Sequence, residues 1–247
     1  MAWVLGLSNQ DYQNDTLILA GDVSDLMPQI ETVLVALKRK FREVFYVPGN
    51  HELWVRRCKT ASSFEKFKLI VHMARESGIR TSVWNDESLT IIPLFSWYDF
   101  SFGEPDEGLK DAWMDFLACV WPDHYSNEDI NKHFLDQNPV SLAPDVGFVI
   151  SFSHFLPRID LMPDQIPQSQ RYLYPVLGSA ALGEQVTKLD PNVHVYGHSH
   201  VNRRVTINQI EYVNNAFGYP SESGITRKRL TCVYDSARFV HHGGALA

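Results

Sequence analysis

The sequence predicts a single-domain α/β fold, and three observations support this. Apolar runs of strand length alternate with stretches whose apolar residues recur at helical spacing. The 247 residues are enough for one large domain, and neither an internal repeat nor a low-complexity linker divides them. Several apolar runs lead directly into Gly followed by Asp, Asn or His. Ligand-binding side chains in open α/β sheets stand at such strand ends.

The first part of the chain shows a regular alternation of helices and strands. Short apolar runs predict strands, and apolar residues three and four positions apart predict helices. The expected helices cover residues 2–7, 28–41 and 62–77, and the expected strands cover residues 16–20, 43–47, 82–84 and 89–94. Pro28 supports the start of the second helix, because proline suits the first helical turn.

Residues 96–145 interrupt this alternation with a long segment rich in aromatic and acidic residues. Two helices are expected within it, at about residues 107–120 and 127–136. A long irregular connection of this kind is typical of a functional insertion, so we expect a cap near a ligand site. Its aromatic residues and a histidine either line a substrate pocket or form a small core of the insertion, and we favour the core. These residues are Trp97, Tyr98, Phe100, Phe102, Trp121 and His124.

The alternation resumes after the insertion. We expect strands at residues 147–152, 193–196, 203–206, 211–214 and 229–233, with a helix at residues 177–189. The whole chain, residues 1–247, is therefore expected to form one domain that carries an insertion at about residues 96–145.

Composition narrows the classes of function. The net charge of −7 and the pI of about 5.8 argue against non-specific nucleic-acid binding, which needs clustered Lys and Arg. No apolar run approaches the roughly 18 residues that span a bilayer. The cysteines, Cys58, Cys119 and Cys232, are odd in number and far apart, which argues against a disulfide framework. This cysteine usage fits a reducing compartment, and the N-terminus does not resemble a signal peptide, so we expect a cytoplasmic location. A targeting segment lost upstream is the alternative. The oligomeric state is not indicated.

Four apolar runs end in side chains that bind metal ions. In chain order they lead to Asp22, Asn50, His154, and the pair His198 and His200. If these strands lie side by side, the five side chains converge on one edge of the sheet. Taken singly, each is more often a turn or core residue, so the ordered set carries the prediction. One carboxylate, one amide oxygen and three imidazoles suit Mn, Fe or Zn.

The ordered set of motifs resembles the calcineurin-like metallophosphoesterase family. Residues 21–25, GDVSD, are similar to its GDxxD motif, and residues 49–52, GNHE, to its GNH[DE] motif. His154 is similar to its lone histidine, and residues 197–200, GHSH, to its GHxH motif. The resemblance extends over about residues 16–235. It implies a four-layer α/β/β/α sandwich with mixed sheets, whose first strand is missing from this chain.

The resemblance also implies a set of metal ligands. Asp22 would bridge two divalent ions, and Asn50, His154 and His198 would complete one of the two metal sites. His200 would serve the other site.

The resemblance further implies roles in catalysis. His51 would protonate or stabilise the leaving oxygen, and Asp25 would orient and charge it. Asn50 would also stabilise charge on the phosphoryl oxygens. Arg158, which follows His154 closely, is a candidate phosphate contact, although an exposed arginine is its default interpretation.

One family motif is missing. The family opens with D-x-H on its first strand, and no D-x-H precedes Asp22 here. The site that His200 serves would keep only Asp22 and His200, so we expect at most one tightly held ion instead of two. A truncated gene model, an alternative start and a genuine loss are all consistent with this gap.

The expected function is metal-dependent hydrolysis of a phosphoester, either a diester or a monoester, by metal-activated hydroxide. A small phosphoester or a nucleotide is the expected substrate. The alternative is a catalytically impaired family member that acts as a binding or scaffold protein, which the missing D-x-H favours. An unrelated metal-binding hydrolase such as an amidase is less supported, because the sequence contains neither HExxH nor GxSxG.

Overall fold

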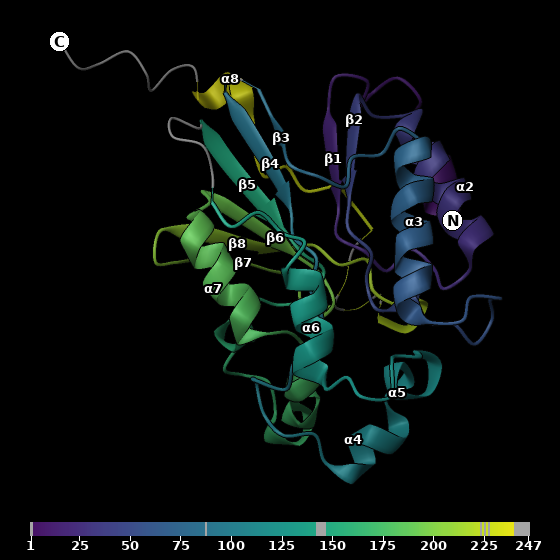
Figure 1. Cartoon of the computed structure of the whole chain (residues 1–247). Coiled ribbons are helices and arrows are strands. Elements are labelled where there is room, and N and C mark those ends of the chain that lie inside the picture. Colours follow the sequence, from purple (N-terminus) through teal and green to yellow (C-terminus); the bar gives the residue numbers. More distant parts are fainter. Residues whose placement is uncertain are drawn as a thin grey trace.

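The computed structural model describes residues 2–86, 88–141, 147–222, 224, 226 and 228–239. Two β-sheets face each other between two layers of helices (Figure 1). The small sheet pairs β1 (Thr16–Leu19) with β2 (Glu43–Tyr46) in parallel. The large sheet has the strand order β3-β4-β5-β6-β8-β7. The predicted mixed α/β sandwich is confirmed.

The small sheet is covered on its outer face by α2 (Met27–Lys38) and α3 (Ser63–Glu76). Apolar residues three and four positions apart on these helices pack onto the strands. The buried set includes Ile30, Leu34, Leu37, Val44, Tyr46, Ile70 and Ala74. The start of α3 is fixed by Ser62, whose hydroxyl accepts the backbone N–H of Glu65 at 3.2 Å. A short helix, α1 (Ala2–Gly6), contacts α2.

The large sheet combines a parallel centre with antiparallel edges. β4, β5, β6 and β8 run parallel, while β3 and β7 pair antiparallel at the two edges. Its strands are β3 (Trp84–Asn85), β4 (Leu89–Pro93), β5 (Phe148–Phe152), β6 (Val193–Tyr196), β7 (Arg203–Ile207) and β8 (Ile210–Asn214). The outer face is covered by α7 (Ala180–Leu189), whose buried residues Leu182, Val186 and Leu189 belong to the same apolar cluster as Tyr196.

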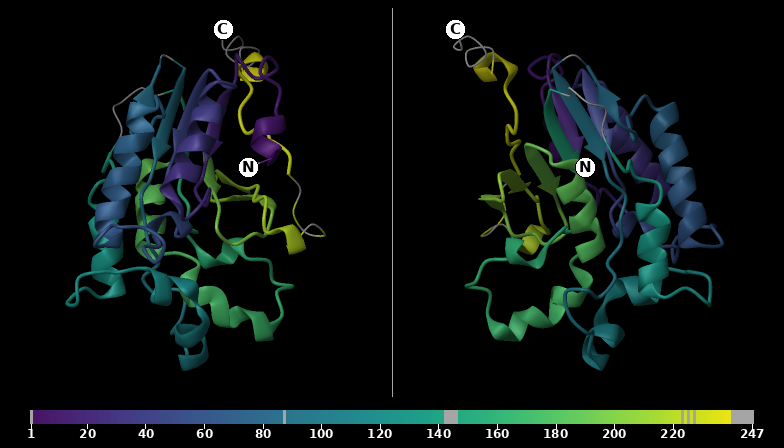
Figure 2. Two further views of the ribbon diagram at one scale, coloured as in Figure 1. Left: turned by 90° about the vertical axis from the view of Figure 1, so that its right-hand side faces the viewer. Right: turned by 60° about the vertical axis from the view of Figure 1, so that its left-hand side comes forward.

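The insertion contributes α4 (Glu107–Ala112), α5 (Met114–Ala118) and α6 (Asn127–Leu135). The helix expected at residues 107–120 is thus two helices, because Trp113 has an extended backbone with ψ 118°. Figure 2 shows the segment that carries α4 and α5 at the lower end of the sandwich in both views. Residues 142–146 lie outside the described residues, and the expected end of the insertion falls among them.

Four of the predicted aromatic residues of the insertion belong to or pack against the apolar cluster between the two sheets, namely Trp97, Tyr98, Phe100 and Trp121. Phe102 packs against the cluster under α7, and His124 is exposed. Trp97 and Tyr98 are each 1% exposed and pack in one cluster with Phe45 of β2 and Phe152 of β5. A core role is therefore confirmed for these two residues. The expectation of a separate small core is wrong, because the insertion shares the apolar layer between the two sheets.

The remaining elements are short. They are the 3₁₀ turns η1 (His51–Leu53), η2 (Ile159–Leu161), η3 (Gln168–Val176) and η4 (Pro220–Glu222), and α8 (Ser236–Phe239). The strand expected at residues 229–233 is wrong. Side chains bind its carbonyl groups where a neighbouring strand would, since Asn215 donates to the Arg229 carbonyl at 2.9 Å and Arg204 to the Cys232 carbonyl at 3.2 Å.

Within the described residues, β1 has β2 as its one strand partner. All four residues of β1 are half-buried, whereas three of the four residues of β2 are buried. The absence of the family's first strand from this chain stays a prediction. Over the same described residues, no helix is both long enough and apolar enough to cross a bilayer.

Candidate metal centre

The ends of β1 and β2 approach each other through two glycines. Gly21 has φ +84°, and a Cβ there would lie 2.6 Å from the Gly49 nitrogen and 2.7 Å from Nδ1 of His154. A Cβ at Gly49 would lie 2.2 Å from Oδ1 of Asp22. Only glycine at these positions leaves room for the Asp22 carboxylate and the His154 ring.

Three of the predicted ligands have a left-handed backbone. The φ angles are 58° at Asp22, 63° at His198 and 53° at His200. Residues other than glycine adopt this conformation rarely, and it concentrates at functional sites where the surrounding structure enforces it. Asp22 lies three residues after the end of β1, and His198 lies two residues after the end of β6.

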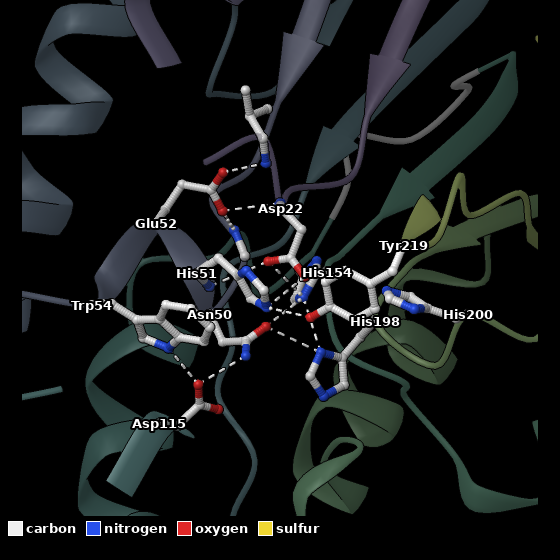
Figure 3. A network of polar contacts seen from close by, with 12 residues as sticks. Asp22, Asn50, His51, Glu52, Trp54, Asp115, His154, His198, His200 and Tyr219 are labelled. Atoms are coloured by element: carbon white, nitrogen blue, oxygen red, sulfur yellow. Dashed lines mark hydrogen bonds and ion pairs between the residues drawn. The ribbon is translucent and has the colours of Figure 1, made fainter. Parts of the chain in front are cut away.

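Four predicted ligands converge at the carboxyl ends of β1, β2, β5 and β6 (Figure 3). Ligand atoms of Asp22, His154 and His198 all lie within 4.8 Å of one another. Oδ1 of Asn50 lies 3.1 Å from Nε2 of His154 and 3.1 Å from Nδ1 of His198. These two ring nitrogens are themselves 3.1 Å apart.

Backbone carbonyl groups fix the tautomers of both rings. Nδ1 of His154 lies 2.7 Å from the Ala20 oxygen, and Nε2 of His198 lies 3.0 Å from the Val176 oxygen. A carbonyl only accepts, so these two nitrogens carry the protons and the inward nitrogens carry lone pairs. Lone pairs of two nitrogens and two oxygens therefore face a common point. They repel one another unless a cation lies between them, so this donor set fits a metal ion.

The protonation states suit metal binding as well. Burial lowers the pKa of His198 to about 3, so its ring is neutral at pH 7. Burial alone would raise the pKa of the Asp22 carboxyl, yet His154 and two other nearby imidazoles outweigh it and hold that pKa below its usual value. A neutral imidazole and an ionised carboxylate are the forms that ligate metals.

Glu52 is a functional residue that the sequence analysis did not single out. It is fully buried, and its carboxylate accepts the backbone N–H groups of Asp22 at 2.9 Å, Val23 at 2.5 Å and Gly49 at 2.7 Å. It thereby ties the loop after β1 to the loop after β2. The acidic residue at the end of GNHE was the available signal, but its burial and partners are not visible in the sequence.

His51 lies beside the four ligands. Its ring stacks on Trp54 with centroids 3.9 Å apart, and its Nε2 lies 3.8 Å from Oδ2 of Asp22. The same nitrogen lies 3.2 Å from the Tyr219 hydroxyl. The ring is partly exposed at 23%, so a ligand at the centre could reach it.

Two other predicted site residues are paired elsewhere. Asp25 accepts from Nε of Arg57 at 2.6 Å, and this arginine holds the pKa of Asp25 below its usual value. Among the described residues, Asp25 and His51 form neither a hydrogen bond nor an ion pair with each other. Arg158 forms a two-pronged ion pair with Asp160 at 2.6 and 2.8 Å. The roles of Asp25 and Arg158 stay predictions.

His200 is the predicted ligand that stands apart. It is not part of the group of ligand atoms within 4.8 Å that the described residues form. Its Nδ1 lies 2.8 Å from Oε2 of Glu222, and its ring packs edge-on against Tyr219 with centroids 5.1 Å apart. The sequence analysis missed Glu222 and Tyr219, because the segment that carries them contains no motif.

A model of the calcineurin-like phosphoesterase family matches residues 2–202, which include all five predicted metal ligands. This chain is a calcineurin-like phosphoesterase. The family resemblance carried by the four motifs is therefore confirmed, and with it the assignment to an enzyme family that hydrolyses phosphoester bonds.

Two comparisons relate this phosphoesterase to a mycobacterial protein. It is 27% identical over 233 residues to the [acyl-carrier-protein] phosphodiesterase PptH of Mycobacterium tuberculosis, covering 85% of this chain and 70% of that protein. The crystal structure of the phosphopantetheinyl hydrolase PptH from the same organism superposes with a TM-score of 0.66 at 24% identity. That superposition covers 87% of this chain and 84% of the other, and it supports the shared fold.

Proposed function

We propose that this phosphoesterase hydrolyses a phosphodiester with the help of a divalent ion held by Asp22, Asn50, His154 and His198. The observation that carries this proposal is the inward orientation of four lone-pair donors, with both imidazole tautomers set by backbone carbonyls. Membership of the family supports phosphoester hydrolysis. The activity named for PptH favours a diester over a monoester.

The donor set suits Mn, Fe or Zn, because it combines imidazole nitrogens with carboxylate and amide oxygens. A divalent ion held there would supply Lewis acidity, which stabilises charge on the phosphoryl group and favours the ionisation of water near neutral pH. Among the proposed ligands, Asp22 contributes one negative charge, and Asn50, His154 and His198 are neutral. The net positive charge left at the centre attracts a phosphate diester anion.

His51 is the proposed proton donor to the leaving oxygen. Stacking on Trp54 fixes the plane of its ring, and Nε2 faces both the Asp22 carboxylate and the Tyr219 hydroxyl. General acid catalysis by a histidine in such a position typically contributes about 10²–10⁴-fold. In this scheme Asp25 would have to leave Arg57 before it could orient His51, and Arg158 would have to leave Asp160 before it could bind phosphate.

The proposed substrate class is a phosphodiester that joins a phosphopantetheinyl group to a carrier protein, as the names given to PptH indicate for that protein. Small phosphoesters and nucleotides are the alternative substrates. A cytoplasmic location is proposed with it, because Cys58, Cys119 and Cys232 are all free thiols, which suits a reducing compartment.

Hydrolysis assays test this function directly. The metal-stripped protein would be supplied with Mn²⁺ and given bis(p-nitrophenyl) phosphate, p-nitrophenyl phosphate and a phosphopantetheinylated carrier protein. We expect diester cleavage that EDTA and His198→Ala both abolish. A folded protein that hydrolyses none of the three with Mn²⁺, Fe²⁺ or Zn²⁺ would overturn the proposal. That outcome would favour a binding or scaffold function, with which the His200–Glu222 pair is compatible.

A further inference from the structure

A buried carboxylate from the insertion reaches the back of the metal centre. Asp115 lies on α5 and is 2% exposed. Its Oδ1 accepts from Nδ2 of Asn50 at 2.8 Å and from Nε1 of Trp54 at 2.6 Å. Its Oδ2 accepts from Nε1 of Trp113 at 2.8 Å. Figure 3 shows Asp115 on the far side of Asn50 from the two histidine ligands.

The contact with Asn50 decides which end of its amide faces the ligands. An asparagine side chain can present either its oxygen or its NH₂ group to a neighbour, and the two orientations have nearly the same shape. Oδ1 of Asp115 already accepts from the indole N–H of Trp54, so the group of Asn50 that faces this oxygen is its NH₂ donor. The Asn50 oxygen must then face His154 and His198. With the amide reversed, two N–H donors would point at the place of the cation and repel it.

We propose that Asp115 is a positioning residue of this enzyme, which fixes the amide of Asn50 so that its oxygen is available to the metal ion. The inference rests on the proposed function, because it takes Asn50 as a ligand. It assigns to the insertion a part in building the metal centre, in addition to any part in choosing the substrate.

The two indole groups on Asp115 extend the same role. Trp54 carries the stacked ring of His51, and Trp113 packs edge-on against His198 with centroids 6.0 Å apart. The Asp115 carboxylate therefore positions the proposed ligand Asn50 directly. It also positions the indole rings of Trp54 and Trp113, which pack against His51 and His198. Burying a carboxylate is costly unless donors surround it, and an apolar residue would pack this space at lower cost. The three donors that converge on Asp115 indicate that this carboxylate serves to position its neighbours and does not only fill space.

Metal affinity tests the proposal without an activity assay. Asp115→Leu removes both acceptor oxygens at similar size, and Asp115→Asn keeps one oxygen that can still accept from Asn50 and Trp54. Mn²⁺ binding to the metal-stripped variants would be measured by titration calorimetry, with circular dichroism as a check of folding. We expect about 10–100-fold weaker binding for Asp115→Leu and a smaller loss for Asp115→Asn. Glu107→Gln, on an 86% exposed carboxylate of the neighbouring helix, is the matched control and should bind normally.

A rescue experiment separates orientation from general packing. A carboxylate at position 50 presents an oxygen to the metal ion in either orientation. The double variant Asn50→Asp with Asp115→Asn should therefore bind Mn²⁺ better than Asp115→Asn alone. The swap keeps the net charge and applies even if Asp115→Leu fails to fold. A folded Asp115→Leu with normal affinity, or a swap that gives no rescue, would overturn the proposal. Normal affinity in Asn50→Ala would instead overturn the proposed ligand set, so the two failures are distinguishable.

Discussion

The two sides of the candidate site are held in different ways. The inner half consists of the four proposed ligands at strand ends of both sheets. The outer half consists of residues in two 3₁₀ turns and in loops. The inner half is Asp22, Asn50, His154 and His198, and the outer half is His51, His200, Tyr219 and Glu222. Backbone carbonyls and buried carboxylates orient the inner half, whereas members of the outer half orient one another.

This difference shows which half is prepared for a cation. In the inner half, the protons of both rings point outward and the lone pairs point inward, so binding needs no rearrangement. In the outer half, His200 already has a carboxylate partner in Glu222. Any ion bound there must share His200 with that carboxylate. The comparison predicts that the same type of substitution, such as His→Ala or Glu→Ala, changes metal affinity or stability more in the inner half than in the outer half.

The largest difference is expected between His198→Ala and His200→Ala. Removing His198 deletes a ligand whose orientation the fold fixes, and we expect tight Mn²⁺ binding to be lost by more than the roughly 10–100-fold that follows loss of a supporting group. Removing His200 should leave one tight ion in place. Calorimetric titration and a metal count after dialysis measure both. Equal losses in the two variants would contradict the division into halves.

A second difference is expected in stability between Glu52→Ala and Glu222→Ala. Without Glu52, the N–H groups of Asp22, Val23 and Gly49, of which the last is buried and the others part-buried, lose their acceptor. An unsatisfied buried group costs about 1–3 kcal/mol. Unfolding in urea should show a loss of about 3 kcal/mol or more. Glu222 is 26% exposed in its pair with His200, so Glu222→Ala should cost less than about 1 kcal/mol. A loss below 1 kcal/mol for Glu52→Ala would show that the inner loops are held by other contacts.

A third effect concerns pH and the strands beneath the inner half. Burial lowers the pKa of His194 from 6.5 to about 3, and its ring bonds Ser151 at 2.8 Å and Ser153 at 3.1 Å. Below pH 6.5, His194 becomes protonated in the unfolded chain but stays neutral in the folded chain. The stability from this neutral ring is complete above pH 6.5 and falls by about 1.4 kcal/mol per pH unit towards pH 3.

The test is urea unfolding of the metal-free protein between pH 7 and pH 4, compared with His194→Gln. The variant lacks this titrating group, so its stability should fall less steeply with acid. Parallel pH profiles for the two proteins would show that the ring does not remain neutral in the folded state.

The smallest effect is expected for Tyr219→Phe in the outer half. The change removes only the hydroxyl that contacts His51 at 3.2 Å. A lost hydrogen bond of about 0.5–1.5 kcal/mol corresponds to a decrease of about 2–10-fold in kcat for the diester. Mn²⁺ affinity should stay unchanged, and weaker metal binding in this variant would show that the two halves are coupled.

The parts of the fold that were predicted are those that local sequence determines. Apolar runs located β1, β2, β5 and β6, and the motifs after them located the inner ligands. The break at Trp113 was missed, because helical spacing continues through it. The strand expected at residues 229–233 was wrong, because pairing depends on a neighbour that the sequence does not reveal.

The missed parts of the site are long-range polar contacts. Glu222 lies 22 residues from His200, and Asp115 lies 65 residues from Asn50. Nothing in the local pattern distinguishes Asp115 from Asp111, an exposed residue four positions earlier on α4. Likewise, the pairing of Asp25 with Arg57 competes with the contact expected from the motif, and only the folded chain shows which partner is near.

The break at Trp113 has a consequence for how this enzyme tolerates change in chain length. α5 is tied to the body of the protein, since the N–H of Val55 donates to the Ala118 carbonyl at 2.8 Å and that of Ser63 to the Val120 carbonyl at 2.8 Å. α4 is mostly exposed and is separated from α5 by one extended residue. Added or deleted residues in α4 need not rotate Asp115, because no continuous helix transmits them. The length of the exposed part of α4 can therefore vary more readily than the spacing from Trp113 to Val120.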